Sequence, residues 1–88
     1  MTFPTIHRNG TYASDLLKGL LAAMNALREA ERKITDAAPN GRDYYPQGDA
    51  AINHAIEEHC DRLTRLEAIR HELDQIAEHV AKEMHEQS

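Results

Sequence analysis

The chain has 88 residues, of which 10 are basic, 15 are acidic and six are histidines, and its formal charge is −5. A chain of this length forms one domain at most, over residues 1–88, and its composition excludes collagen and a disulfide scaffold. It also excludes a domain roomy enough for an ordinary enzyme pocket, so we predict that the protein is not an enzyme. The single cysteine, Cys60, permits no intrachain disulfide and no cysteine-based metal site within one chain.

Charge is divided unevenly along the sequence. Residues 1–48 have six basic and five acidic side chains, whereas residues 49–88 have four basic and ten acidic ones. Affinity for nucleic acid comes from neutralising phosphates with Lys and Arg, so the acidic second half argues against a nucleic-acid partner. No apolar run reaches the roughly 18 residues of a membrane span, which predicts no membrane partner and a cytoplasmic protein. An anionic ligand is expected on the first half.

The first predicted element is an N-terminal arm over residues 1–12, because Pro4 and Gly10 interrupt it and it has no periodicity. The arm leads into a predicted helix, and a helix N-terminus presents free N–H groups and the positive end of the helix dipole. An ordinary capped helix start and a ligand-binding arm both remain open here. If the arm binds a ligand, its candidate residues are His7, Arg8 and Tyr12.

A helix is expected over residues 13–38, with Thr11 or Ser14 as its hydroxyl cap and Asp15 in its first turn. Its apolar positions recur at steps of three or four residues, which is the period of an amphipathic helix. One glutamate interrupts this stripe, whose members are Ala13, Leu17, Leu20, Met24, Leu27, Glu31, Ile34 and Ala38.

Residues 39–48 are predicted to form the connecting loop, in which Asn40-Gly41 supplies the positive φ of a helix stop. Ten residues exceed the two to five that a plain helical hairpin needs. One interpretation is that both tyrosines of the loop fold back over the open end of the bundle while its arginine pairs with Asp43 or Asp49. The other is a recognition surface, on which tyrosine rings stack on a planar ligand and a guanidinium holds an anion. The candidate ligand residues are Arg42, Tyr44 and Tyr45.

A second, longer helix is expected over residues 49–86, with Asp49 at its cap, because no Gly or Pro follows that residue. Its seam advances by three or four residues at every step and includes two polar positions. The seam residues are Ile52, Ile56, His59, Leu63, Leu66, Arg70, Leu73, Ala77, Val80 and Met84.

Together the two helices predict an all-α fold, an antiparallel helical hairpin with an N-terminal arm. A hairpin buries only one face of each helix, so we expect it to self-associate, as a homodimer or a higher oligomer, into a helical bundle. Since the second helix is the longer one, its last turns are expected to extend past the first helix. The segment Phe3–Ile6 would cover those turns in part.

The polar seam positions predict specific contacts. Antiparallel pairing that starts at the loop places Ala38 opposite residue 50, so Glu31 is expected to contact His59. The same register places Arg70 near Leu17–Leu20, where its guanidinium would extend outward or meet a partner chain.

Metal and catalytic chemistry find little support in the sequence. The Glu-x-x-His signature of bundle di-metal sites is absent, and so is His-x-x-x-His, so we expect no metal and no cofactor within one chain. No serine or threonine lies in a strand–turn–helix setting that would activate it, so no catalytic residue is predicted. Three histidine–acid pairs are interpreted as solvated helix surface, with a metal held between chains as the open alternative: His54/Glu58, Glu67/His71 and His79/Glu83.

Three motifs carry a family resemblance: Asn9-Gly10-Thr11 before the first helix, Glu58-His59, and the loop Pro-Asn-Gly-Arg-Asp-Tyr-Tyr-Pro-Gln-Gly over 39–48. They resemble a group of short helical proteins encoded by phages and prophages, over roughly residues 7–80. The resemblance implies a phage accessory protein acting in the cytoplasm of the bacterial host. It implies no catalytic residues.

Small phage proteins with oligomeric pockets include proteins that sequester the nucleotide signals of bacterial defence systems. By analogy, we expect an anti-defence protein whose oligomer binds a small anionic, nucleotide-like ligand where the arm of one chain meets the loop of its partner. The alternative is an adaptor or inhibitor that contacts a basic host protein through the acidic face of the second helix, with Glu57, Glu58, Asp61 and Glu72.

Overall fold

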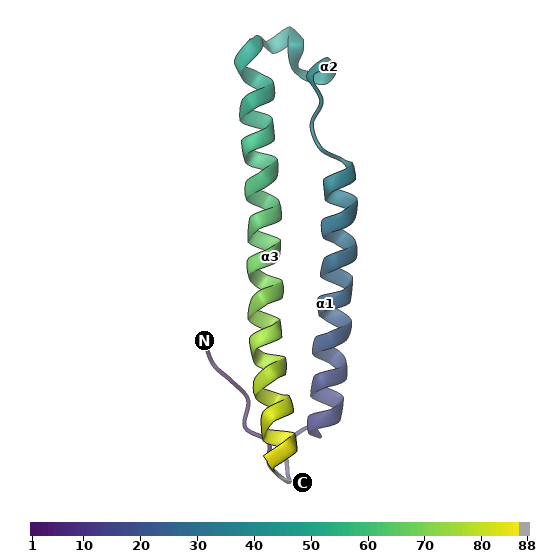
Figure 1. Cartoon of the computed structure of the whole chain (residues 1–88), viewed down its shortest axis with the longest axis vertical. Helices are drawn as coiled ribbons and strands as arrows, with labels where there is room; N and C mark the ends of the chain where they lie inside the picture. Colours follow the sequence, from purple (N-terminus) through teal and green to yellow (C-terminus); the bar gives the residue numbers. More distant parts are fainter. Residues whose placement is uncertain (87–88) are drawn as a thin grey trace.

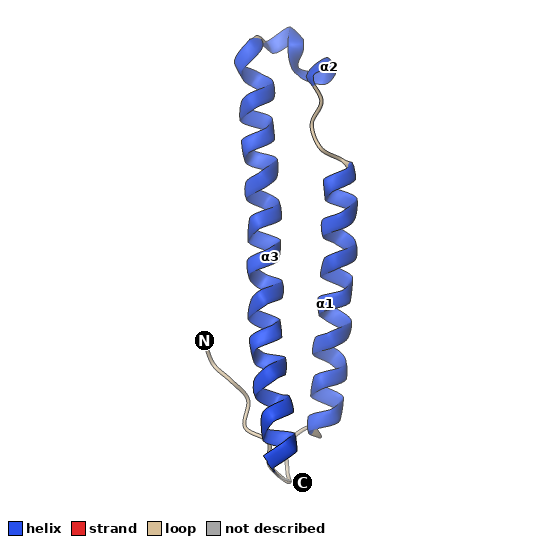
Figure 2. Ribbon diagram, in the orientation of Figure 1, coloured by secondary structure: helices blue, strands red, loops and turns tan. Residues whose placement is uncertain are grey.

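Two long helices make up most of the computed structural model, which describes residues 1–86 (Figure 1). Helix α1 spans Ala13–Asp36 and helix α3 spans Asp49–Glu86, and the two run antiparallel and pack side by side. Between them lie the short helix α2, Gly41–Tyr44, and the 3₁₀ helix η1, Tyr45–Gln47. Figure 2 shows helix and loop only over the described residues, so the predicted all-α hairpin is confirmed. None of these helices is long and apolar enough to cross a lipid bilayer.

The start of α1 differs from the expected hydroxyl cap. Tyr12 is the N-cap residue, in extended backbone, and no side chain caps the helix. The carbonyl oxygen of Tyr12 accepts hydrogen bonds from the amides of Asp15 and Leu16, both at 3.0 Å. The prediction of a Thr11 or Ser14 cap is therefore wrong, because the helix begins between these two residues and neither side chain bonds to its free amides. Asp15 does lie in the first turn, as expected.

The connection between the long helices is more ordered than a loop. Helix α1 ends at Asp36, where the amide of Ala37 donates to the carbonyl oxygens of Lys33 and Ile34, at 3.1 and 3.0 Å. Gly41 does not supply a positive φ at this stop, because it begins α2. Among the described residues, positive φ occurs at Gly48, at 104°, directly before α3. This conformation favours glycine and lets the chain reverse into the second long helix.

The register between the helices corrects the predicted one. Glu31 of α1 contacts Arg70 of α3, not His59, which lies eleven residues earlier and therefore about three helical turns away. As Figure 1 shows, α1 stops short of the start of α3, and residues 37–48 continue to that end. The unmatched part of α3 is thus its N-terminal part, whereas the sequence predicted an overhang at its C-terminal end. The physical reason is that residues 37–48 extend alongside the start of α3, so the pairing of the two long helices does not begin at residue 38.

The core is small and consists largely of small side chains. Val80 is fully buried, and Met24 retains 3% of its exposure. Glu83 and His79 hold the arm against the last turns of α3, so the segment Phe3–Ile6 lies against these turns as expected. Large apolar side chains elsewhere on the helices remain exposed by 39–47%: Leu21, Ile56, Ile69 and Met84.

Candidate functional site

The turn that carries the loop candidates is organised by Asn40. Its Oδ1 accepts from the backbone amide of Asp43 at 3.3 Å, and its Nδ2 donates to the Asp43 carboxylate at 2.9 Å. Asn40 thus acts as the side-chain cap of α2, which fixes the direction of the next residues. Because the Asp43 carboxylate is bound to Asn40, it does not pair with Arg42. Within residues 1–86, no ion pair engages Arg42, and its side chain is exposed.

The two adjacent tyrosines have different surroundings. Tyr44, the last residue of α2, is half-buried and lines a concavity, whereas Tyr45 is 77% exposed. Successive residues on a helical turn point about 100° apart, so both rings cannot fold onto the same surface. The interpretation that both tyrosines cover the end of the hairpin is therefore wrong for Tyr45. Only Tyr44 packs inward.

The concavity beside Tyr44 has a volume of about 440 Å³ and lies between the α2–η1 turn and the first turns of α3. Its volume falls in the range of small-molecule sites, roughly 300–1,000 Å³. Polar groups of several kinds surround a floor of two alanines. The lining residues are Pro39, Tyr44, Gln47, Ala51, His54, Ala55, Glu58 and Arg62.

The arm candidates lie at the opposite end of the hairpin. His7, Arg8 and Tyr12 are all exposed, and Tyr12 retains 75% of its exposure. A turn closed by the amide of Gly10 and the carbonyl oxygen of His7, at 3.1 Å, orients this segment. The His7 ring lies over Gly10 so closely that a Cβ there would come 2.8 Å from its Nε2. A side chain at this position would displace the exposed His7 ring from its place over the turn.

Within one chain, the structure does not bring the arm and loop candidates together. The molecule measures 61 Å along its longest axis, and the two segments lie at the two ends of α1 (Figure 1). A site that uses both groups of residues therefore needs a second chain. The sequence prediction had placed this site between chains for the same reason.

Contacts that hold the arm were not predicted from the sequence. The Phe3 ring stacks on the His79 ring with centroids 4.9 Å apart, and His79 Nε2 donates to the Pro4 carbonyl oxygen at 3.0 Å. The amide of Ile6 donates to Glu83 Oε2 at 2.9 Å, while Oε1 lies 3.2 Å from His79 Nε2. The interpretation of His79/Glu83 as solvated surface is therefore wrong. The sequence placed the arm near the last turns of the second helix, but the four-residue spacing did not show that this pair would bind it.

Replacing Phe3 with alanine is expected to loosen the arm without unfolding the hairpin. The ring stacking contributes on the order of 1 kcal/mol, so the amide of Ile6 should exchange with solvent about threefold to tenfold faster. Amides in the middle of α1 should keep their rates in hydrogen exchange followed by NMR. Met1→Ala is the matched control, because Met1 is 62% exposed. An equal acceleration by both variants would contradict a role for the stacked pair.

The polar seam forms a different pair from the one expected. Arg70 Nε donates to Glu31 Oε2 at 2.8 Å and Nη2 donates to Oε1 at 3.4 Å, with side-chain exposures of 26% for Arg70 and 17% for Glu31. This hydrogen bond, followed by the nearby negative charges of Glu31, Glu67 and Asp74, raises the pKa of Arg70, which partial desolvation opposes. Meanwhile His59 Nε2 is buried without a hydrogen-bond partner among the described residues.

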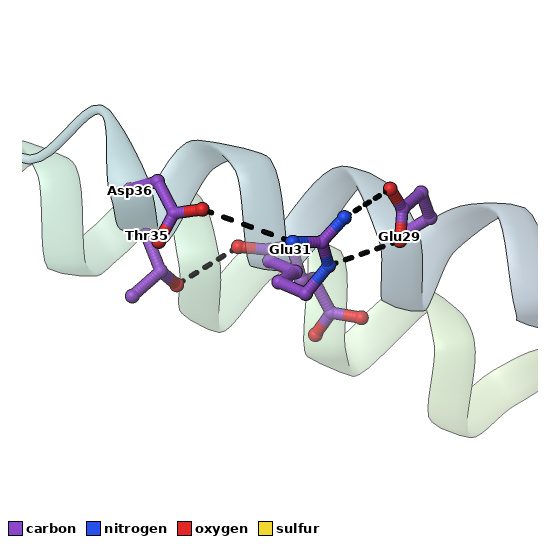
Figure 3. Close-up of polar contacts among 5 residues, drawn as sticks. Glu29, Glu31, Thr35 and Asp36 are labelled. Carbon is purple, nitrogen blue, oxygen red and sulfur yellow. Dashed lines mark hydrogen bonds and ion pairs between the residues drawn. The ribbon is translucent and has the colours of Figure 1, made fainter.

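Other charges on α1 lie on its outer surface. Arg32 pairs with Glu29 and Asp36, at 2.5 and 3.9 Å, whereas Figure 3 shows the Glu31 carboxylate away from these two acids, on the side toward α3. Thr35 Oγ1 donates to the Glu31 carbonyl oxygen at 2.8 Å. Because Glu31 points away from Glu29 and Asp36, it is the one of these three acids that contacts α3.

No cluster of three or more metal-binding side chains occurs among residues 1–86. Of the three histidine–acid pairs, His79/Glu83 is in contact, and its atoms are engaged with the arm.

Comparison with protein-family models, curated proteins and solved structures finds no match to this chain. The phage-protein grouping therefore stays a prediction, and the function has to be inferred from the geometry.

Proposed function

We propose that the protein is a non-enzymatic phage accessory protein of the anti-defence type, which self-associates and sequesters a small anionic, nucleotide-like ligand. The observation that carries the proposal is the concavity beside Tyr44, which Arg62 also lines. An aromatic ring and a guanidinium that border one concavity match the two halves of a nucleotide, a planar base and a phosphate. Arg42 lies in the same short helix as Tyr44 and has no ion pair within residues 1–86.

Self-association is supported by the surface area of the chain. One chain exposes 6673 Å², whereas a compact protein of 10.0 kDa exposes about 5,200 Å². The radius of gyration is 19.0 Å, against about 12 Å for a compact domain of this length. The excess, about 1,500 Å², exceeds the roughly 800 Å² that each partner buries in a standard interface. A second copy that covers the exposed apolar side chains of α1 and α3 would remove this excess, and two copies arranged antiparallel would bring arm and loop together.

Two measurements test the proposal. Light scattering after size-exclusion chromatography should give a mass that is a multiple of 10.0 kDa, and a monomer would contradict the shared site. In a thermal-shift assay, at least one of cyclic di-GMP, cyclic di-AMP, cyclic GMP-AMP and ADP-ribose should raise the Tm by several degrees, because a ligand that binds only the folded state stabilises it. Arg42→Ala with Tyr44→Ala should remove the shift. Arg28→Ala, on the exposed side of α1, is the control.

The alternative is an adaptor that acts through the acidic face of α3, where two of the four acids form solvent-exposed ion pairs of little energetic weight. Arg65 lies 2.9 Å from Asp61, and Arg62 lies 3.5 Å from Glu58, so two of the four acids already have cationic neighbours. Reversing the charges of Glu57 and Glu72 distinguishes the two functions. Ligand binding should be unchanged if the proposal holds, whereas capture of a host protein should be lost if the alternative holds.

A further inference from the structure

One side of the concavity beside Tyr44 is formed by residues of α3, which were not among the candidate ligand residues of the loop. Ala51, Ala55, Glu58 and Arg62 recur at three- and four-residue steps on α3 and so form one stripe facing the α2–η1 turn. The two alanines leave room above the helix backbone, and the longer side chains follow at one end. A ligand in the concavity would therefore lie along α3 and meet the carboxylate and the guanidinium in turn.

The flat groups of the concavity suit a heteroaromatic ring. Tyr44 and Pro39 come from the connection and His54 comes from α3, so planar or apolar surfaces border the space from both sides. Such rings favour offset stacking on a planar ligand. A base is thus expected here, with its edge facing the polar side chains.

The carboxylate of Glu58 bears on which hydrogen-bonding edge of a base the concavity would prefer. Its carboxylate meets Arg62 through Oε2 at 3.5 Å, a solvent-exposed pair of little energetic weight, and no hydrogen bond engages Oε1 within residues 1–86. An ionised carboxylate only accepts hydrogen bonds, so it selects a ligand edge with two adjacent N–H donors. Guanine has such an edge in N1–H and the N2 amino group. The adenine edge places its N1 lone pair against the carboxylate.

We infer that this concavity is the base-recognition part of the proposed ligand site and that it selects guanine through Glu58, while Arg62, which lines the same concavity, is available for the phosphate. This inference rests on the proposed function and adds a base preference to it. Two other concavities lie along α3: one of about 470 Å³, whose Arg70 is already bound to Glu31, and one of about 420 Å³ lined by charged side chains. Neither is lined by a tyrosine or by a residue of the connection, so a planar ligand would not be bordered from two sides there.

Isothermal titration calorimetry with cyclic di-GMP and cyclic di-AMP tests the inference, because these probes share a backbone and differ in the base. The unmodified protein should bind cyclic di-GMP at least about tenfold more tightly, since a good bidentate contact discriminates between bases by about that factor. Glu58→Gln should reduce the ratio to about threefold or less, by weakening the binding of cyclic di-GMP. Glu57→Gln is the matched control, because that neighbouring acid does not line the concavity, and it should keep the full ratio.

The outcomes separate this inference from the proposed function. Equal affinities, a preference for the adenine probe, or an unchanged ratio in Glu58→Gln would overturn the guanine assignment, while nucleotide binding itself would stand. If ADP-ribose binds and no guanine nucleotide does, the guanine assignment would likewise be overturned while nucleotide binding would stand. If none of the nucleotides binds, both the proposed function and the base preference are contradicted. Circular dichroism of Glu58→Gln should match that of the unmodified protein, because the side chain is exposed.

Discussion

Replacing Val80 with aspartate is expected to abolish the folded hairpin at 25 °C. Val80 has no exposed surface, and a carboxyl group there would be buried without a partner, at a cost of about 4 kcal/mol or more. A chain of this length has a total stability of about 4–13 kcal/mol, and this hairpin has a small core, so the lower part of that range applies. The helical signal in far-ultraviolet circular dichroism should therefore be largely lost.

Two further variants show that the loss reflects burial. Gln75→Asp adds the same charge at an exposed position of the same helix and should retain the helical signal. Val80→Ala removes two methyl groups without adding a charge and should lower the free energy of unfolding by about 2 kcal/mol, measured by urea denaturation. A folded Val80→Asp protein with an unchanged urea midpoint would show that α3 does not bury this residue in solution.

How much of the fold could be predicted depends on the range of the interactions. The helices around Met24 and Val80 follow from a local three- and four-residue period, and both predicted helices exist. The register depends on the connection instead, where Asn40 caps a further helix that no apolar period predicts. Because residues 37–48 continue past the end of α1 to the start of α3, Glu31 meets Arg70 rather than His59.

The candidate site was predictable in its residue types but not in its geometry. The arginine and tyrosines of the loop were recognised from their density in the sequence, yet only the structure separates the inward Tyr44 from the exposed Tyr45. Glu58 and His54 were noticed as a spaced pair on one helix. Their place beside the loop depends on how the α2–η1 turn folds back on α3, and no local pattern encodes that contact.

The Glu31–Arg70 pair is expected to fix the register between the helices, and removing one partner should have a large effect. Arg70→Met leaves the Glu31 carboxylate, which is only 17% exposed, without its cation. We expect the Tm to fall on the order of 10 °C, because breaking a partly buried pair leaves one charge poorly solvated. Arg65→Met is the matched control: its pair with Asp61 has the same chemistry but is 66% exposed on both sides, so the Tm should change little.

Changing both partners distinguishes an unpaired charge from lost packing. Glu31→Leu combined with Arg70→Met replaces the pair with apolar side chains, and its Tm should return to or exceed that of the unmodified protein. The effect of Arg70→Met should also be the same at pH 7 and pH 10. The raised pKa of Arg70 means that its contribution is complete below the unfolded-state pKa and is lost only as pH rises through the still higher folded-state value. A Tm loss no larger than that of Arg65→Met, or a double variant less stable than Arg70→Met, would show that the pair does not fix the register.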